Sequence, residues 1–291
     1  MNSIFRKVLI GINGVIGYIY KTAVDLHLIS CPALGDRETA DVVVSLTSYG
    51  RRVKNNVVYY TIISLLRQKR QPCRIILWLA EDEWNDNNIP KKLYGLKDNG
   101  VEIRYCNDIK SYKKLIPTLS NYPNSVIITF DDDMIYSRDA VKVLFDEHLK
   151  HPHDIICRAA RKPIILNGLP QKYSEWEDSI LKPFVNGTSG ELLFPVGVGG
   201  VLYPCGALHS DVLNKDWYMK FCPHADDIWF WFCGLRNHTI KRYVLGQKKD
   251  HSFDSIYQYL HNGSALTHSN NSQHQNDEQL VSLFQFFDSV I

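Results

Sequence analysis

The chain has 291 residues, enough for one large domain or two small ones. Apolar residues make up 45% and charged residues 22% of it, which excludes a disordered chain, a collagen and a coiled coil. The formal charge is only +2, so no overall field favours nucleic acid as a partner, and any anion site must be local.

The first predicted element is an uncharged, largely apolar run at residues 8–20, preceded by two basic residues. The run is too short to span a bilayer but is typical of a helix that lies along a membrane surface. Two alternatives stay open: an ordinary first helix packed on the domain, and a lipoprotein signal ending at Cys31. Lys21 and Asp25 count against the lipoprotein signal. Residues 1–40 are therefore treated as a separate segment with a possible peripheral membrane role.

Between residues 41 and 150, short β-branched runs alternate with longer stretches of helical periodicity. Strands are predicted at residues 42–46, 74–79, 101–105 and 125–130, and helices at residues 56–68, 90–98, 111–120 and 138–150. Four strand–helix repeats in succession predict an α/β fold around a largely parallel sheet.

The regular alternation stops at residues 158–200, which are rich in Gly and Pro and are expected to form a functional loop. The remaining predicted elements are strands at residues 155–159, 198–204 and 239–244, and helices at residues 207–214, 226–235 and 277–287. We expect one domain at residues 41–247, followed by a polar tail with a short helix at residues 248–291.

Three adjacent carboxylates, Asp131, Asp132 and Asp133, directly follow the apolar strand predicted at residues 125–130. Ligands of open parallel sheets bind beyond the carboxyl ends of the strands, where this triplet falls. Period-2 alternation puts Asp131 and Asp133 on one face. Both would then reach one divalent cation, or one would bind the cation and the other a sugar hydroxyl. The alternative is a solvated acidic turn that caps the next helix.

The sequence resembles the D-x-D glycosyltransferases of the GT-A fold, in particular the family 2-like enzymes of bacterial capsule and lipopolysaccharide synthesis. The resemblance covers residues 41–244. It depends on VVSLTSY at residues 43–49 as first strand and nucleotide loop, on the acidic triplet as D-x-D motif, and on ADDIW at residues 225–229 as acceptor-side motif.

This resemblance implies a Rossmann-like nucleotide-binding half with a central mixed sheet and an irregular acceptor-binding half. It also implies a nucleotide-sugar donor and a Mn²⁺ or Mg²⁺ ion, held by Asp131 and Asp133, that bridges the D-x-D motif to the diphosphate. Such an ion offsets the charge of the leaving nucleoside diphosphate without proton transfer.

Further donor contacts are expected after the first strand. Thr47 and Ser48 would offer hydroxyl and backbone N–H groups to the nucleotide, and Arg51 or Arg52 would meet a phosphate. The alternative is a polar loop whose arginines are merely solvated.

By the same resemblance, Glu81 and Asp82 follow the second strand where similar enzymes hold the base or ribose. Similar enzymes also often keep a basic residue for the donor where Lys113 and Lys114 lie, against the alternative of a solvated helix face. The resemblance also implies that one of the tail histidines would complete the metal shell, and His251 is preferred because it follows the last strand.

An inverting transfer needs a carboxylate that deprotonates the acceptor hydroxyl. The resemblance assigns Asp227 as this base and Asp226 as the partner of the helix dipole. Residues 197–200 (GVGG) lack the Lys-Ser/Thr of a phosphate loop and are interpreted as a close approach of backbone and acceptor. Trp176 and Trp217 are candidates for stacking on sugars, although core packing is the commoner fate of tryptophan.

Two other function classes stay open. A nucleotidyltransferase acting on sugar phosphates could use a similar sheet but usually has a Gly-rich basic loop after the first strand, which LTSYG at residues 46–50 is not. A non-catalytic carbohydrate-binding protein would use the 6 tryptophans and 16 tyrosines but leaves the acidic triplet unexplained.

The seven cysteines include no C-x-x-C pair, which favours reduced thiols and a cytoplasmic location. We expect a metal-dependent cytoplasmic enzyme, and a location at the inner face of the cell membrane stays open. It would transfer a sugar from a UDP-sugar to a glycan or lipid-linked glycan acceptor.

Overall fold

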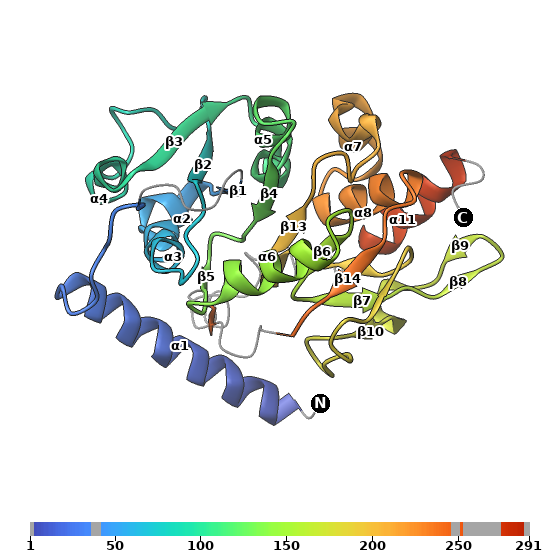
Figure 1. Cartoon of the computed structure of the whole chain (residues 1–291), viewed down its shortest axis with the longest axis horizontal. Coiled ribbons are helices and arrows are strands. Elements are labelled where there is room, and N and C mark those ends of the chain that lie inside the picture. The colour runs from blue at the N-terminus through green and yellow to red at the C-terminus, as the bar shows by residue number, and fades with distance from the viewer. Residues whose placement is uncertain (1–2, 36–41, 246–250, 253–274, 288–291) are drawn as a thin grey trace.

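The computed structural model describes residues 3–35, 42–245, 251–252 and 275–287. An eight-stranded sheet in the order β11-β14-β6-β13-β4-β1-β2-β3 runs through the protein (Figure 1). Its strands are β1 (Val42–Thr47), β2 (Arg74–Ala80), β3 (Val101–Cys106), β4 (Val126–Thr129), β6 (Ile155–Cys157), β11 (Ser189–Gly190), β13 (Val201–Tyr203) and β14 (Lys241–Tyr243).

The sheet has a parallel half and a mixed half. Strands β4, β1, β2 and β3 are all parallel, which confirms the predicted βα repeats. Strand β13 runs antiparallel to both β4 and β6, while β14 is parallel to β6 and β11 is antiparallel to β14. The fold is therefore α/β with a central mixed sheet, as the sequence predicts.

Three smaller sheets surround the central one. They pair β10 (Glu177–Asp178) and β12 (Phe194–Pro195) with β7 (Ala160–Lys162), β15 (His251–Ser252) with β5 (Met134–Ile135), and β8 (Ile165–Leu166) with β9 (Leu169–Pro170). The stretch expected to be an irregular loop thus contains several short strands.

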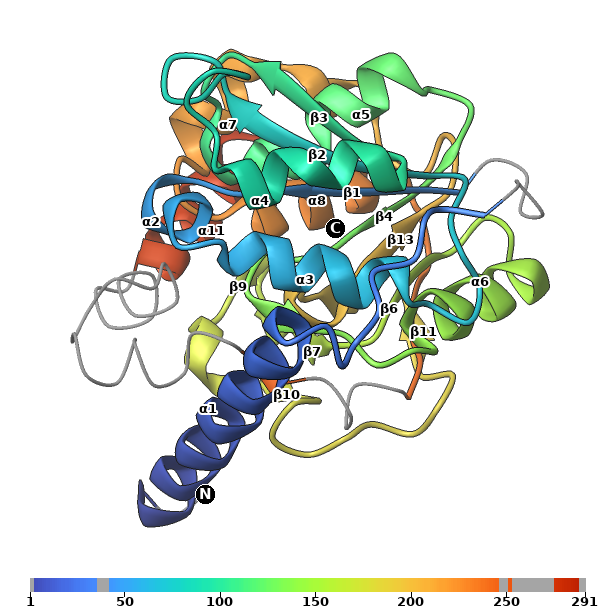
Figure 2. The same ribbon diagram turned by 90° about the vertical axis from the view of Figure 1, so that its left-hand side faces the viewer.

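Helices cover both faces of the sheet (Figures 1 and 2). The α-helices are α1 (Ser3–Asp25), α2 (Gly50–Lys54), α3 (Val57–Leu66), α4 (Lys91–Tyr94), α5 (Ile116–Asn121), α6 (Ala140–Lys150), α7 (Lys215–Phe221), α8 (Asp226–Arg236) and α11 (Gln275–Phe286). The 3₁₀ helices are η1 (Gly95–Asn99), η2 (Lys110–Lys114), η3 (Tyr173–Glu175), η4 (Gly197–Gly199) and η5 (Ser210–Leu213).

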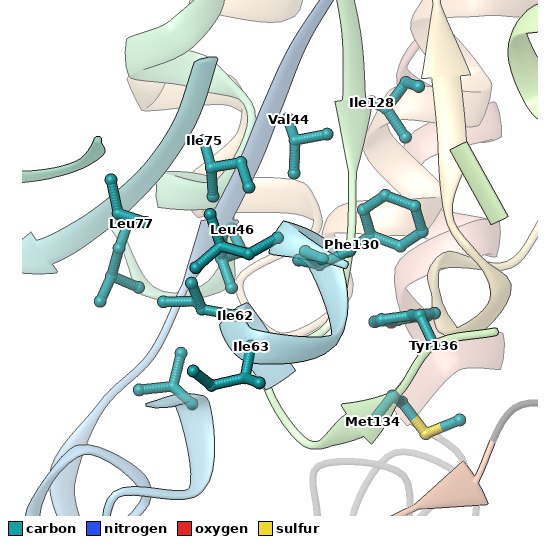
Figure 3. Packing of buried hydrophobic residues seen from close by; sticks show 14 of the residues in the cluster. Val44, Leu46, Ile62, Ile63, Ile75, Leu77, Ile128, Phe130, Met134 and Tyr136 are labelled. Atoms are coloured by element: carbon teal, nitrogen blue, oxygen red, sulfur yellow. The ribbon is translucent and has the colours of Figure 1, made fainter. Parts of the chain in front are cut away.

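Alternation along the buried strands sends neighbouring side chains into two different cores. Leu46 and Ile128 lie in a cluster with Ile62 of α3 (Figure 3). Ile127, next to Ile128 in β4, belongs instead to a second cluster that includes Trp229 of α8. Because both faces of β4 are buried, its sequence is a continuous apolar run, as expected for a central strand.

The C-terminal helix belongs to the second core. Leu280, Leu283 and Phe284 of α11 are buried in the same cluster as the aromatic residues of α8. Helix α11 thus packs against the protein, and the expected domain boundary after residue 247 remains a prediction.

The structure differs from the predicted elements in several places. Helix α2 (Gly50–Lys54) forms where no helix was predicted. The helix predicted at residues 207–214 is wrong: this stretch contains only the 3₁₀ helix η5, and an unpredicted helix, α7, follows it. The helix predicted at residues 111–120 is split into η2 and α5, with Pro117 in the first turn of α5. The helix predicted at residues 90–98 is α4 followed by the 3₁₀ helix η1. The strand predicted at residues 198–204 begins only at Val201.

None of the helices in the described residues is both long enough and apolar enough to cross a membrane.

Candidate active site

Strand β4 ends at Thr129, and the acidic triplet forms the turn that leads into β5. The alternation expected to place Asp131 and Asp133 on one face therefore does not continue past the strand. Asp132 and Asp133 lie in one group of side chains, around Arg52, and Asp131 lies in another, around Lys114.

Asp132 and Asp133 form the first group with Arg52. Ser48 donates its hydroxyl hydrogen bond to the buried Asp132 carboxylate (Oγ–Oδ2 2.5 Å), and Thr61 donates to the Asp132 backbone carbonyl (2.9 Å). Arg52 binds both carboxylates, at 2.5 Å to Asp132 and 2.8 Å to Asp133. A single guanidinium thus neutralises much of the charge repulsion in the triplet.

Asp131 belongs to the second group, which is centred on the buried Lys114. The Lys114 ammonium lies 2.7 Å from Asp226 Oδ2, 3.4 Å from Asp227 Oδ1 and 3.7 Å from Asp131 Oδ1. Gly197 donates its backbone N–H to Asp227 Oδ2 at 3.0 Å. Three carboxylates from the β4–β5 turn and from the start of α8 therefore meet at one lysine.

Burial governs the charges in this second group. Burial raises the pKa of Asp227 to about 6, with Lys114 opposing the shift and the neighbouring Asp226 adding to it. The pKa of Asp131 is also raised by burial. Burial alone would lower the pKa of Lys114, but the three carboxylates outweigh it and hold this pKa well above its usual value. The three carboxylates therefore favour the charged form of Lys114, whereas the pKa of Asp227 is raised to about 6.

Of the residues expected to bind the nucleotide-sugar donor, some contact the acidic triplet and others do not. Ser48 contacts the triplet, but the Thr47 hydroxyl donates to the Trp78 backbone carbonyl at 2.8 Å. Arg52 makes ion pairs with Asp132 and Asp133 of the triplet. Glu81 is exposed at the end of β2 beside Asp82.

The lysine that enters the site is Lys114, whereas Lys113 forms an ion pair with Asp108. Sequence spacing did not separate the two. The hydroxyl of Tyr136 was not expected either: it accepts the Asp131 backbone N–H at 3.0 Å and contacts the Val198 carbonyl at 3.3 Å. Nothing in the sequence around Tyr136 signals this role.

For His251, the structure describes only the backbone. Strand β15 pairs His251 with Ile135 and Ser252 with Met134, so the backbone of His251 runs beside the strand that leaves the triplet. The His251 side chain is outside the described part of the structure, so its expected role as a metal ligand stays a prediction.

The two tryptophans proposed to stack on sugars both contact aromatic side chains, and Trp217 remains partly exposed. Trp176 is buried and lies 5.5 Å, between ring centroids, from Phe194. Trp217 lies 5.0 Å from Phe287. The core-packing alternative is thus the one observed for Trp176.

The donor set of the triplet suits a divalent cation, although no group of three or more metal-ligating side chains occurs among the described residues. Mg²⁺ is commonly held by one or two carboxylates together with substrate phosphates, so two protein carboxylates are sufficient. Asp131 and Asp133 are both partly accessible to solvent.

Comparisons with known proteins identify no family. No family model and no curated protein matches the sequence. Among solved structures, three crystal structures of residues 1–349 of S. aureus TarS are similar. The complex with UDP shares 14% identity over 75% of this chain and 62% of that chain, with a TM-score of 0.44.

The other two TarS structures give similar values. The structure whose description names no ligand has 12% identity, covers 84% of this chain and 72% of that one, and has a TM-score of 0.43. The complex with UDP-GlcNAc has 13% identity, covers 72% and 56%, and has a TM-score of 0.42. A likeness this weak transfers no property of TarS to this chain, which spans less than two thirds of the first of these structures.

Proposed function

We propose that this protein is a metal-dependent GT-A glycosyltransferase that uses a nucleotide sugar, with a UDP-sugar as the donor, in the synthesis of a bacterial surface polysaccharide. One observation carries the proposal. The acidic triplet at the end of β4 is connected through Lys114 to the acid pair that begins α8. A leaving-group side and a base side therefore meet in one site.

The leaving-group side is formed by Arg52, Asp131 and Asp133. The guanidinium of Arg52 lies where it can bind a diphosphate. Asp133 and Asp131 would hold Mn²⁺ or Mg²⁺, which when bound offsets the charge that develops on the departing diphosphate. Ser48 and Thr61 fix Asp132, so the turn that carries these ligands has a defined shape.

The base side is formed by Asp227. Its carboxylate accepts the proton of the acceptor hydroxyl as that oxygen bonds to the anomeric carbon and the bond from this carbon to the diphosphate breaks. The Gly197 N–H orients one carboxylate oxygen, and a pKa of about 6 leaves Asp227 ionised but basic at neutral pH. Attack from the face opposite the diphosphate inverts the configuration.

The proposal is tested by incubating the full chain with a panel of nucleotide sugars and Mn²⁺, and measuring nucleoside diphosphate release. Asp133→Asn is expected to remove the metal dependence and most of the activity. Asp98→Asn, at an exposed carboxylate in η1, serves as the matched control and is expected to behave as wild type. No release from any nucleotide sugar, or unchanged Mn²⁺ dependence in Asp133→Asn, would contradict the proposal.

A further inference from the structure

Helix α1 has an apolar stripe that the described protein leaves uncovered. Val15, Tyr18 and Ile19 are 55%, 73% and 60% exposed, and their spacing places them on one side of the helix. The other side is buried at Gly14 and Gly17, where the absent side chains let the helix lie close against the protein. Helix α1 is thus attached along one side and apolar along the other.

A second exposed apolar segment is the loop at residues 179–188, which links β10 to β11. Ile180, Leu181 and Val185 are 49%, 65% and 81% exposed, and the exposed Lys182 lies among them. Figures 1 and 2 share a vertical axis, and in both views this loop and α1 lie at the lower side of the protein. Two segments far apart in the sequence, each with exposed apolar side chains, therefore lie at one side of the protein.

Both segments adjoin the candidate active site. Helix α1 contacts β15, which pairs with β5, the strand that directly follows the acidic triplet. The loop follows β10, which belongs to the same small sheet as β12. Strand β12 leads into η4, whose Gly197 binds Asp227. Both apolar segments are therefore linked, through short paired strands, to elements that carry residues of the candidate site.

We propose that the exposed side of α1 and the loop at residues 179–188 form one surface that binds an anionic lipid bilayer. The charges agree with this occupant, because α1 contains three basic residues and one acidic residue and the loop contributes Lys182. Leucine, isoleucine and valine side chains favour the boundary of headgroups and acyl chains, and tyrosine is enriched there. A bilayer contacts a helix and a separate loop simultaneously without matching the shape of either.

Bilayer binding by this surface is independent of the proposed reaction. A further consequence, which rests on the proposed function, is that the site lies beside the membrane, where a lipid-linked acceptor would be available. Membrane binding and sugar transfer can therefore succeed or fail separately.

The test is cosedimentation of the full chain with vesicles of phosphatidylcholine, with or without phosphatidylglycerol. Wild type is expected to bind the vesicles that contain phosphatidylglycerol, and salt is expected to weaken this binding. Ile19→Asp and Leu181→Asp should each lower the partition coefficient about tenfold. The matched control is Leu149→Asp, at a leucine that is 61% exposed on α6, outside this surface; it should bind as wild type.

Nucleotide-sugar hydrolysis and thermal unfolding of each variant, measured without vesicles, show whether the fold and the site are intact, and both are expected to match wild type. Wild type that ignores anionic vesicles would overturn the proposal. It would also be overturned if either Asp variant bound as wild type does, since both segments are required. A change of oligomeric mass in these variants, without lipid binding by wild type, would show that a second copy covers the surface.

Discussion

At the scale of single residues, Asp227 has the properties of a general base. It is partly buried, one of its oxygens is held by the Gly197 N–H, and its pKa is raised to about 6. The active form is the carboxylate, so kcat/KM should fall as the pH is lowered through about 6. A pH–rate profile of wild type checks this, and a rate independent of pH between 5 and 7 would argue against Asp227.

Asp227→Asn keeps the size of this side chain but removes the proton acceptor, and its single amide oxygen can accept from only one of the two donors, the Gly197 N–H and the Lys114 ammonium. Transfer should fall by roughly 10²- to 10⁴-fold while UDP binding, measured by calorimetry, stays nearly unchanged. Asp226→Asn is the comparison variant, because Asp226 is the partner closest to Lys114. Full activity in Asp227→Asn together with loss in Asp226→Asn would exchange the two roles.

Gly197 leaves space at the centre of the acidic cluster. A Cβ at this position would lie 3.0 Å from Lys114 Nζ, 3.1 Å from Asp227 Oδ1 and 3.4 Å from Asp131 Oδ1. Gly197→Ala should therefore displace these polar atoms by a few tenths of an ångström and lower kcat by roughly tenfold or more. Gly190→Ala is the control, since a Cβ there meets no atom within 4 Å. Equal kcat values for the two variants would disprove this role of Gly197.

The sequence predicts the acidic residues of the candidate site but not how they are grouped. Three adjacent aspartates after an apolar strand are visible in any sequence, and so is the acid pair before an apolar helix. Asp131 pairs with Lys114, and Asp133 pairs with Arg52. These pairings depend on where β4 ends, because side chains alternate between the two faces only within the strand. Tertiary placement of the two cations could not be derived from spacing along the chain.

At the scale of secondary structure elements, strands with buried faces were predicted well and short helices were not. β1, β2 and β4 are apolar enough to be identified without tertiary information. Helix α7 was missed although Asn214 caps it, accepting the Trp217 N–H at 3.2 Å. The apolar residues just before it favoured placing the helix about two turns too early.

Helix α11 follows a polar stretch of sequence and was expected to belong to a tail, but it packs into the second core. Leu283 is fully buried in the second core, so Leu283→Ala should lower the free energy of unfolding by about 2–5 kcal/mol. Gln285→Ala, at an exposed position on the same helix, should change it little. Urea unfolding measures both variants. Equal stability of Leu283→Ala and wild type would mean that the helix is a separable tail.

At the scale of the whole molecule, the two halves of the sheet contribute different residues to the candidate site. The parallel half ends at the acidic triplet and provides Ser48, while the mixed half reaches the site through the turn before β13 that contains Gly197. The parallel half was predictable from its repeats, because each strand and helix is close to the next in sequence. The mixed half pairs strands that are distant in sequence, and local patterns carry no information about such pairing.

The mixed half also contains a buried lysine that should affect the stability of the whole protein. Lys241 in β14 is fully buried and donates to the Glu191 backbone carbonyl at 2.7 Å. Burial lowers its pKa from 10.5 to about 7. Between these values the unfolded chain binds a proton that the folded protein does not, so this residue makes the unfolding free energy increase with pH.

Comparison with Lys241→Met isolates this effect, because methionine fills a similar volume without a charge. Below pH 7 the folded protein must accommodate the buried ammonium, so the variant should be the more stable protein there by the largest margin. From pH 7 to pH 9 wild type should gain about 2 kcal/mol relative to the variant. Urea unfolding of both proteins over this range measures the difference, and stability curves that stay parallel would show that Lys241 keeps its proton in the fold.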